Sequence, residues 1–403
     1  MKVTKYFIYI LIIIYFTIIS HNFLINNYEP FKIKFFNKFL VDSVVIKNNH
    51  IDLVKNNLKI FLRSLYSNKI DSIKYIYTNS AEYKLKKIYN SEKTAGVIFD
   101  NYFKIYEQND TQKIIKEFNT LNLINDLVAF QPVKQFFLYK NNYIGLLSFK
   151  SNNKFYIKII NFTKKFIIFQ SPNLPSGEVD FNGIGGGFTN YNNNLLFAIG
   201  TPSSNSKDSI SLLGQNMKSP FGKILIFSDF EILNGPANYH KFKIFSSGHR
   251  NPQAMLFLNN TIYEIEHGPR GGDELNIIKY KKNYGWPLYS FGVSYEGHKY
   301  PIPIDSNSYA KPIYFFLPSI APSDLISCPS EFASKFKPYT CLLMSTLKEK
   351  SLYILILDPS NRIIGTEKID IGFRVREMII LDNNLFISTD GFGIYELTKI
   401  KDY

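Results

Sequence analysis

The sequence predicts an all-β fold, a six-bladed β-propeller, with an N-terminal transmembrane helix. Two features predict the β structure. Aromatic residues make up 16% of the 403 residues, including 36 Phe and 28 Tyr, and such side chains suit a pleated, half-buried sheet surface. In addition, a unit of a polar turn followed by a short apolar strand recurs along the chain. The transmembrane helix is predicted from an apolar run between Tyr6 and Ile19.

The N-terminus has the pattern of an export signal. Lys2 and Lys5 precede the apolar run, as the charged and hydrophobic regions of a signal do. Residues 20–23 are Ser-His-Asn-Phe, so no small-residue cleavage site follows. We therefore expect residues 1–25 to remain as a signal anchor, although the shortness of the run leaves cleavage open. With the lysines inside, the rest of the chain is expected outside the cytoplasm, on the periplasmic or extracellular side.

Residues 26–70 are expected to form a linker that contains an amphipathic helix. Turn residues are scarce there, and apolar side chains recur at helical spacing: Ile51, Val54, Leu58, Phe61, Leu62 and Leu65. A helix packed against the first blade would show the same pattern. No chemistry can be assigned to this segment.

The propeller is predicted over residues 71–403. Pairs of Asn or Asp-Asn precede short apolar strands, as hairpin turns do, at residues 100–101, 141–142, 193–194, 259–260 and 383–384. The pairs are about 40, 50, 65 and 125 residues apart, and a period of roughly 40–60 residues in β sequence is typical of propeller blades. About 330 residues at this period correspond to six blades. An Asn-rich composition alone could also produce such pairs.

The positive net charge of the chain limits the kinds of partner that we expect. The net charge is +14, but the basic residues are scattered and no nucleic-acid motif accompanies them, so nucleic acid is not expected. Attraction to an anionic membrane suits a chain anchored at its N-terminus better.

Cys328 and Cys341 are the two cysteines. They could pair in an oxidising compartment or remain as buried thiols.

Three runs with unusual residues lie close together in the second half of the chain. They are Gly-His-Arg-Asn-Pro-Gln at 248–253, Glu-His-Gly-Pro-Arg-Gly-Gly-Asp-Glu-Leu-Asn at 266–276, and Asn-Tyr-Gly-Trp-Pro at 283–287. The first two flank strand-like segments and are expected to be loops at blade ends. Pro269 removes a backbone donor, which leaves carbonyl oxygens available to a cation. With the acidic Asp273 and Glu274 nearby, such oxygen ligands suit calcium, although a Gly/Pro turn alone is usually only a turn.

In combination, these runs resemble the family of quinoprotein aldose, glucose and sorbosone dehydrogenases. Members of this family are six-bladed propellers that bind pyrroloquinoline quinone (PQQ) and calcium near the propeller axis. Further matches are Pro-Ser-Ile-Ala-Pro-Ser at 318–323, Leu347-Lys348, Arg374-Val375-Arg376 and residues 385–390. Gly214 and residues 221–224 also fit upstream. The resemblance covers residues 180–395, about half of the chain.

The resemblance implies a cofactor site and a reaction. Its cofactor-binding residues are Arg250, Asn251, Lys348, Arg374 and Arg376, and guanidinium groups suit the three carboxylates of PQQ. The main-chain carbonyls of Gly268 and Pro269 would bind Ca²⁺. The implied reaction oxidises the C1 hydroxyl of an aldose by hydride transfer to the quinone. The sugar and the electron acceptor are not identified.

One departure from the family concerns the catalytic base. The family carries a histidine two residues before a Gly-Gly pair, and Gly183 stands at this position, with Gly187 in place of an arginine. None of the six histidines falls in register, so the catalytic residue is unknown. Asp180 is the nearest ionisable group that could act as the base, and Arg250 could have an electrostatic role. The alternative is a catalytically silent propeller that binds a sugar, a cofactor or a protein. A metal-dependent lactonase is disfavoured because no carboxylate-rich metal set is evident.

Overall fold

The computed structural model describes residues 73–402 with gaps. The gaps fall at 79–80, 90–95, 100–102, 109–111, 119–122, 124–125, 127–132, 175–178, 204–206, 296, 298, 302–307, 382–383 and 391–392. The predicted signal anchor (1–25) and linker (26–70) lie outside the described residues. Among the residues that are described, no helix is both long and apolar enough to span a bilayer.

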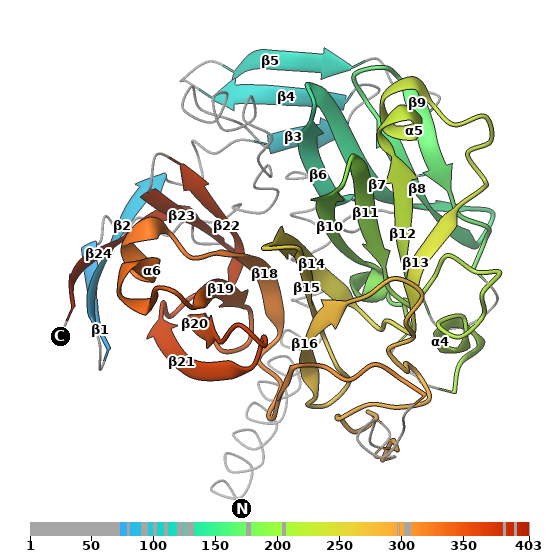
Figure 1. Cartoon of the computed structure of the whole chain (residues 1–403). Helices are drawn as coiled ribbons and strands as arrows, with labels where there is room; N and C mark the ends of the chain where they lie inside the picture. The colour runs from blue at the N-terminus through green and yellow to red at the C-terminus, as the bar shows by residue number, and fades with distance from the viewer. Residues whose placement is uncertain are drawn as a thin grey trace, which may run out of the picture.

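Six antiparallel sheets make up the described fold (Figure 1). The first complete sheet comprises β6 (Val133–Tyr139), β7 (Asn142–Ser151), β8 (Lys154–Asn161) and β9 (Phe166–Gln170). The next comprises β10 (Gly185–Tyr191), β11 (Asn194–Ile199), β12 (Lys223–Ser228) and β13 (Lys243–Ser247). Two more follow, with β14 (Pro252–Leu258), β15 (Thr261–Glu266), β16 (Asp273–Ile278) and β17 (Tyr314–Phe316), then β18 (Pro322–Ser327), β19 (Thr340–Thr346), β20 (Ser351–Leu357) and β21 (Ile363–Asp370).

The closing sheet joins the two ends of the described chain. Its order is β1–β2–β24–β23–β22, with β1 (Ile73–Tyr77), β2 (Ala81–Tyr89), β22 (Val375–Leu381), β23 (Asn384–Thr389) and β24 (Gly393–Asp402). A three-stranded sheet holds β3 (Gly96–Phe99), β4 (Phe103–Gln108) and β5 (Gln112–Phe118). Short helical turns are η2 (Phe181–Ile184), α4 (Ser209–Leu212), α5 (Asp229–Asn234), α6 (Ser330–Ala333) and η4 (Ser334–Phe336).

The sheets succeed one another as the blades of a propeller. The first strands of consecutive sheets contact each other, β6 with β10, β10 with β14, β14 with β18, and β18 with β22. This arrangement places each first strand on the inside of the ring (Figure 1). The prediction of an all-β propeller is confirmed, with five blades established by these contacts where the sequence predicted six.

Asparagine turns connect the strands because asparagine accepts a left-handed backbone. Asn192 and Asn193 have φ of 45° and 56°, and Asn259 and Asn260 have φ of 49° and 59°. Two consecutive residues with positive φ form the tight turn whose twist matches antiparallel strands. At the hairpin between β6 and β7 the left-handed residues are Lys140 and Asn141, one position earlier than the Asn pair.

Packing between blades is largely aromatic and aliphatic. Phe137 of β6 stacks on Phe188 of β10 with ring centroids 3.7 Å apart, and Phe197 of β11 packs beside them. All three middle residues Leu195, Leu196 and Phe197 are fully buried, because a blade is covered on both faces by its neighbours. The high aromatic content therefore fills the spaces between blades.

The open question about the cysteines is settled by the fold. Cys328 and Cys341 form a disulfide with their Cα atoms 5.4 Å apart. The bond lies at the β18–β19 hairpin, where the backbone N–H of Cys328 also donates to the Cys341 carbonyl at 3.0 Å. It closes the loop that carries α6.

Candidate functional site

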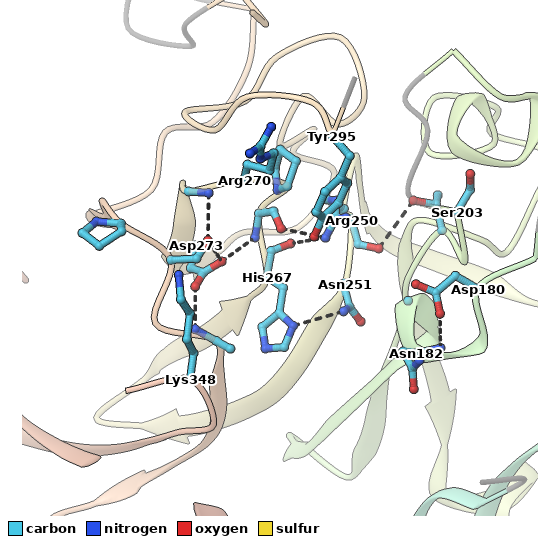
Figure 2. Close-up of a pocket in the computed structure, with 18 of the residues that line it drawn as sticks. Asp180, Asn182, Ser203, Arg250, Asn251, His267, Arg270, Asp273, Tyr295 and Lys348 are labelled. Atoms are coloured by element: carbon cyan, nitrogen blue, oxygen red, sulfur yellow. Dashed lines mark hydrogen bonds between the residues drawn. The ribbon is translucent and has the colours of Figure 1, made fainter. Parts of the chain in front are cut away.

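A pocket of about 590 Å³ opens at one end of the ring. Loops from several blades form its walls, and Figure 2 shows Asp180 and Asn182 on one side, Lys348 on the other, and Arg250, Asn251 and His267 between them. The lining residues are Asp180, Asn182, Gly183, Thr201, Ser203, Arg250, Asn251, His267, Gly268, Pro269, Arg270, Gly271, Asp273, Tyr295, Leu317, Pro318, Ser319, Ala321 and Lys348. Five of the predicted residues, Arg250, Asn251, Lys348, Gly268 and Pro269, thus share one pocket.

The loop before β14 carries Arg250 and Asn251 and is fixed from behind by Glu266. The Glu266 carboxylate accepts the backbone N–H of Arg250 at 2.6 Å and that of Asn251 at 3.3 Å. The Arg250 guanidinium lies over the ring of Trp286, 5.2 Å from its centroid. Trp286 in turn donates its indole N–H to Thr201 at 2.7 Å. Both the backbone and the side chain of Arg250 are therefore positioned before any ligand binds.

The Arg250 guanidinium also reaches the loop after β15. Its Nη1 donates to the carbonyl oxygens of His267 at 3.0 Å and Gly268 at 2.8 Å. Its Nε is buried and has no hydrogen-bond partner among the described residues. One edge of this guanidinium is therefore engaged, while its buried Nε has no acceptor among the described residues.

Asp273 ties two walls of the pocket together. Its carboxylate accepts the backbone N–H groups of Gly268 at 3.0 Å, Ile320 at 2.8 Å and Ala321 at 2.7 Å, and the hydroxyl of Ser319 at 3.1 Å. Four donors satisfy the oxygens of this buried carboxylate. Asp273 thus joins the 267–272 loop to the 317–321 loop, and it is not available as a base.

His267 is the histidine that lines the pocket, and both ring nitrogens are engaged. Nε2 lies 2.7 Å from the Pro322 carbonyl, so it carries the proton, and Nδ1 lies 3.3 Å from the Asn251 amide nitrogen. Burial lowers the pKa of His267, the charge of Asp273 and the Pro322 carbonyl oppose this, and the charges of Arg250 and Arg376 lower it further. We conclude that His267 is a neutral ring that orients Asn251.

Lys348 and Arg270 add positive charge at the mouth. Lys348 follows β19, and its backbone N–H donates to the Ile320 carbonyl at 3.1 Å. Both side chains are exposed and line the pocket. The sequence motifs pointed to Lys348 but did not single out Arg270. Together with Arg250, which also lines the pocket, Lys348 and Arg270 make the pocket attractive to an anion.

Arg374 and Arg376, by contrast, are not among the lining residues. Both guanidinium groups pair with Asp390, with Nε of Arg374 3.1 Å and Nε of Arg376 2.9 Å from its carboxylate oxygens. Arg376 is close enough to influence the pKa of His267. The convergence expected for four cations is therefore found for Arg250 and Lys348. Arg374, just before β22, and Arg376 within it are instead directed to a carboxylate of their own blade.

Gly183 and Gly187 are closely surrounded by backbone atoms. A Cβ on Gly183 would lie 3.0 Å from Cα of Pro202 and 3.2 Å from the Thr201 carbonyl oxygen. A Cβ on Gly187 would lie 3.0–3.1 Å from backbone atoms of Ala254. In both cases backbone atoms are the obstacle, so a histidine or an arginine would need the main chain to move.

Asp180 lines the pocket, and it is the acidic residue nearest in sequence to Gly183. It is exposed, and Oδ1 accepts the backbone N–H of Asn182 at 2.9 Å, which caps the η2 turn. The Asp180 N–H donates to the Pro202 carbonyl at 2.8 Å. The second carboxylate oxygen makes Asp180 a candidate proton acceptor.

Comparisons with known proteins agree with this architecture. The family model for glucose/sorbosone dehydrogenase matches residues 164–394. An uncharacterised protein of Synechocystis is 31% identical over 209 residues, which cover 49% of this chain and 50% of the relative. An aldose sugar dehydrogenase of Escherichia coli is 32% identical over 155 residues, 37% of this chain and 41% of the relative. The matched region thus spans half or less of these relatives.

Solved structures support the fold. The apo-form of the soluble aldose sugar dehydrogenase from Escherichia coli aligns with a TM-score of 0.60 at 20% identity, and covers 80% of this chain and 100% of that one. The PQQ-bound aldose sugar dehydrogenase from Streptomyces coelicolor aligns with a TM-score of 0.50 at 17% identity, and covers 85% of this chain and 98% of that one. At these identities, the likeness concerns the propeller itself.

Proposed function

The chain belongs to the glucose/sorbosone dehydrogenase family of soluble quinoproteins, and we propose that it is a PQQ-dependent sugar dehydrogenase that oxidises an aldose at C1. The single observation that carries this proposal is the shared pocket of Arg250, Asn251 and Lys348. These residues come from loops that are distant in sequence. Their shared position in one pocket supports the cofactor-binding roles that the family motifs imply.

The pocket has features that fit a polycarboxylate such as PQQ. The buried Nε of Arg250 lacks a partner among the described residues, and a carboxylate would satisfy it with a charge-assisted hydrogen bond. Lys348 and Arg270 face the pocket from its rim, where they would pair with further carboxylates. Bound PQQ would supply a carbonyl carbon that accepts hydride from a sugar C–H bond.

The proposal includes a Ca²⁺ ion bound beside PQQ, with the main-chain carbonyls of Gly268 and Pro269 as its candidate ligands. Both residues line the pocket. The Gly268 carbonyl already accepts Nη1 of Arg250 at 2.8 Å, so one of its two lone pairs is used. The proposal therefore requires calcium to share this oxygen with Arg250 or to displace the guanidinium.

The protein residues would bind and orient a sugar rather than carry out the electron transfer. Asp180 would accept the proton of the hydroxyl that is oxidised, because Asp273 and His267 are both engaged by other groups. Arg250 would stabilise negative charge that develops on the acceptor. Tyr295, exposed at the pocket mouth, offers an aromatic face to a sugar ring.

A second function, a silent binding propeller, is favoured by one observation. Gly183 stands where the family has its base, and a side chain there would need the backbone around Thr201 and Pro202 to shift. A positioned base typically contributes about 10²–10⁴ in rate. Without a substitute, the pocket would bind a cofactor or a sugar but turn over slowly.

An experiment in two steps separates these functions. The purified full-length chain is titrated calorimetrically with PQQ in the presence of Ca²⁺, and then dye-linked oxidation of a panel of aldoses is measured. Binding with turnover supports the dehydrogenase. Binding without turnover supports the silent propeller. If PQQ does not bind with or without Ca²⁺, the quinone-dependent dehydrogenase is wrong, and a silent propeller would have to bind a sugar or a protein instead.

Variants locate the cofactor site. Lys348→Ala should weaken PQQ binding at least tenfold, since a charge-assisted contact contributes about 1.5–3 kcal/mol. Lys241→Ala is the matched control, because Lys241 is exposed and lies outside the pocket, and it should bind PQQ like the wild type. Equal affinity of all three proteins would show that PQQ, if bound, occupies another place.

Two further proposals concern the whole chain. We propose that β3–β5 forms the sixth blade, which would give the propeller the blade number that the sequence predicts.

We also propose that the N-terminal segment anchors the chain so that the propeller lies outside the cytoplasm, with no nucleic-acid partner. Protease protection of the propeller in intact cells, compared with permeabilised cells, tests its location.

A further inference from the structure

A group of buried acidic side chains lies behind the pocket, and the proposed chemistry does not use its charge. Glu264 and Glu266 lie on β15, opposite Asn276 and Glu274 of β16. Their exposed fractions are 0% for Glu264 and Asn276, 4% for Glu266 and 9% for Glu274. His249, with 0% exposed, completes the group. Three carboxyl groups in one buried place require an explanation, because unpaired buried charge is costly.

Hydrogen-bond donors are too few for these carboxyl groups. The Asn276 amide nitrogen lies 3.1 Å from Glu264, 3.3 Å from Glu266 and 3.2 Å from Glu274, yet an amide has two N–H bonds. Oε1 of Glu264 is buried with no partner among the described residues. Among the described residues, the acceptor atoms of this group therefore outnumber the donors that reach them.

His249 presents a nitrogen to the same group. Its Nε2 lies 2.9 Å from the Ser246 hydroxyl. Its Nδ1 has no hydrogen-bond partner among the described residues and lies 3.5 Å from Oε1 of Glu266. This distance is long for a hydrogen bond. It is close to the spacing of neighbouring ligand atoms around an ion with bonds of about 2.0–2.2 Å. The Ser246 hydroxyl fixes the orientation of the ring through its other nitrogen, a role that a carboxylate, a carbonyl or a water usually has for metal-binding histidines.

We propose that His249, Glu264 and Glu266 bind a divalent transition-metal ion, such as Zn²⁺ or Mn²⁺. One ligand atom from each residue lies within 4.8 Å of the others. The imidazole ligand favours a transition metal over calcium, which prefers oxygen. The site is distinct from the pocket-facing carbonyls of Gly268 and Pro269.

The ion has a clear structural role in this position. The other oxygen of Glu266, Oε2, accepts the backbone N–H groups of Arg250 and Asn251. A metal on Oε1 would fix the Glu266 carboxylate and would offset negative charge behind the Arg250 loop. The bound ion would therefore hold one wall of the pocket in place.

A titration with metal alone tests the site. The full-length chain is treated with a chelator, desalted, and titrated calorimetrically with ZnCl₂ or MnCl₂, with no quinone or sugar present. We expect one equivalent to bind per chain. His249→Gln and Glu264→Gln should each weaken binding at least tenfold, because even outer-shell substitutions cost about 10–100-fold. His240→Gln is the control, since His240 is exposed on another loop, and it should bind like the wild type.

The Glu264→Gln variant keeps the test informative. A glutamine has the shape of a protonated glutamic acid, so the metal-free variant should unfold at nearly the temperature of the metal-free wild type. Metal should raise the unfolding temperature of the wild type but not that of the variant. The proposal is overturned if the wild type binds neither ion, or if both variants bind as the wild type does. Because no quinone is added, this result is independent of the proposed function.

Discussion

At the scale of single residues, the pocket separates side chains that are fully engaged from those that remain available. Asp273 accepts four hydrogen bonds, and both nitrogens of His267 are occupied. Asp180 uses one oxygen to cap η2. Arg250 retains a buried N–H without a partner among the described residues. Hydrogen bonding, rather than residue type, therefore identifies the groups that are free to meet a ligand.

The role of Asp180 gives the first residue-scale prediction. In the quinone-loaded protein, Asp180→Asn should lower the rate of sugar oxidation by about 10²–10⁴, the usual contribution of a positioned base. Asparagine retains the oxygen that caps η2, so PQQ affinity and stability should be unchanged. Steady-state kinetics and calorimetry measure both quantities. Asp370→Asn, at the outer edge of a blade, is the control, and equal rates for the two variants would exclude Asp180 as the base.

Lys223 gives a second residue-scale prediction. Its Nζ lies 2.8 Å from the carbonyl oxygens of Leu213 and Gly214 and 3.0 Å from that of Phe221. The ammonium form donates to all three and the neutral amine to two of them, and either form fixes the loop near α4. Burial lowers the pKa of Lys223 from 10.5 to about 7. Between these values the unfolded chain binds the proton and the folded chain has released it. The free energy of unfolding should therefore rise with pH above about 7.

Chemical denaturation of the wild type and Lys223→Met between pH 6 and pH 9 measures this contribution. The variant lacks the titrating group, so the stability difference between the two proteins should change with pH in favour of the wild type. A constant difference across this range would contradict the shifted pKa.

At the scale of elements, each blade depends on hairpins and on the links between them. The Asn-based turns are local, since residues such as Asn259 and Asn260 adopt positive φ without help from distant contacts. The Asp273 carboxylate and the Cys328–Cys341 disulfide act between elements. The first joins the loops on either side of the pocket, and the second closes the excursion between β18 and β19.

The disulfide leads to an element-scale prediction. Replacing both Cys328 and Cys341 by serine should lower stability by about 2–4 kcal/mol, because the bond limits the freedom of the unfolded chain. Calorimetric unfolding in the absence of reductant measures this loss. Adding reductant should bring the wild type to the unfolding temperature of the double variant and should leave the variant itself unchanged. An unaffected wild type would show that the bond contributes little.

At the scale of the whole molecule, the ring is closed by strands from both ends of the described chain. β24 lies between β2 and β23 and forms hydrogen bonds with both. The closing blade therefore requires that residues 73–89 and 393–402 meet, although they are far apart in sequence. In the described part of the chain, this pairing ties the last blade to the N-terminal strands.

Removing β24 should prevent cooperative folding. A chain that ends at residue 392 leaves β2 and β23 without their shared partner, so we expect a broad transition or none in circular dichroism melts. A chain lacking only Tyr403 serves as the control and should melt like the wild type. A truncated protein with the wild-type unfolding temperature would show that closure is not needed.

Much of the fold was predictable because propeller signals are local. Hairpin turns depend on a few neighbouring residues, and short alternating strands between them predict blades. The loop motifs around Arg250, Gly268 and Trp286 also indicate the family, because each motif is a short run of consecutive residues. The number of blades was less secure, since five are established by contacts between sheets and the sequence predicted six.

The direction of long side chains was not predictable in the same way. Arg376 and Lys348 both follow family motifs, but Arg376 is directed to Asp390, whereas Lys348 faces the pocket. Such choices depend on partners from other loops. The engagement of Asp273 by Ile320 and Ala321 depends equally on the third dimension.

By itself, the sequence determined the propeller class, the family and the loops that would form a site, because these depend on short-range turn chemistry and on motifs that lie close together. Tertiary structure alone decided that Cys328 and Cys341 pair, that backbone atoms closely surround Gly183, and that Glu264, Glu266 and His249 are buried together. The physical reason is that pairing, free volume and burial are relations between distant segments. They acquire values only when the blades pack around a common axis.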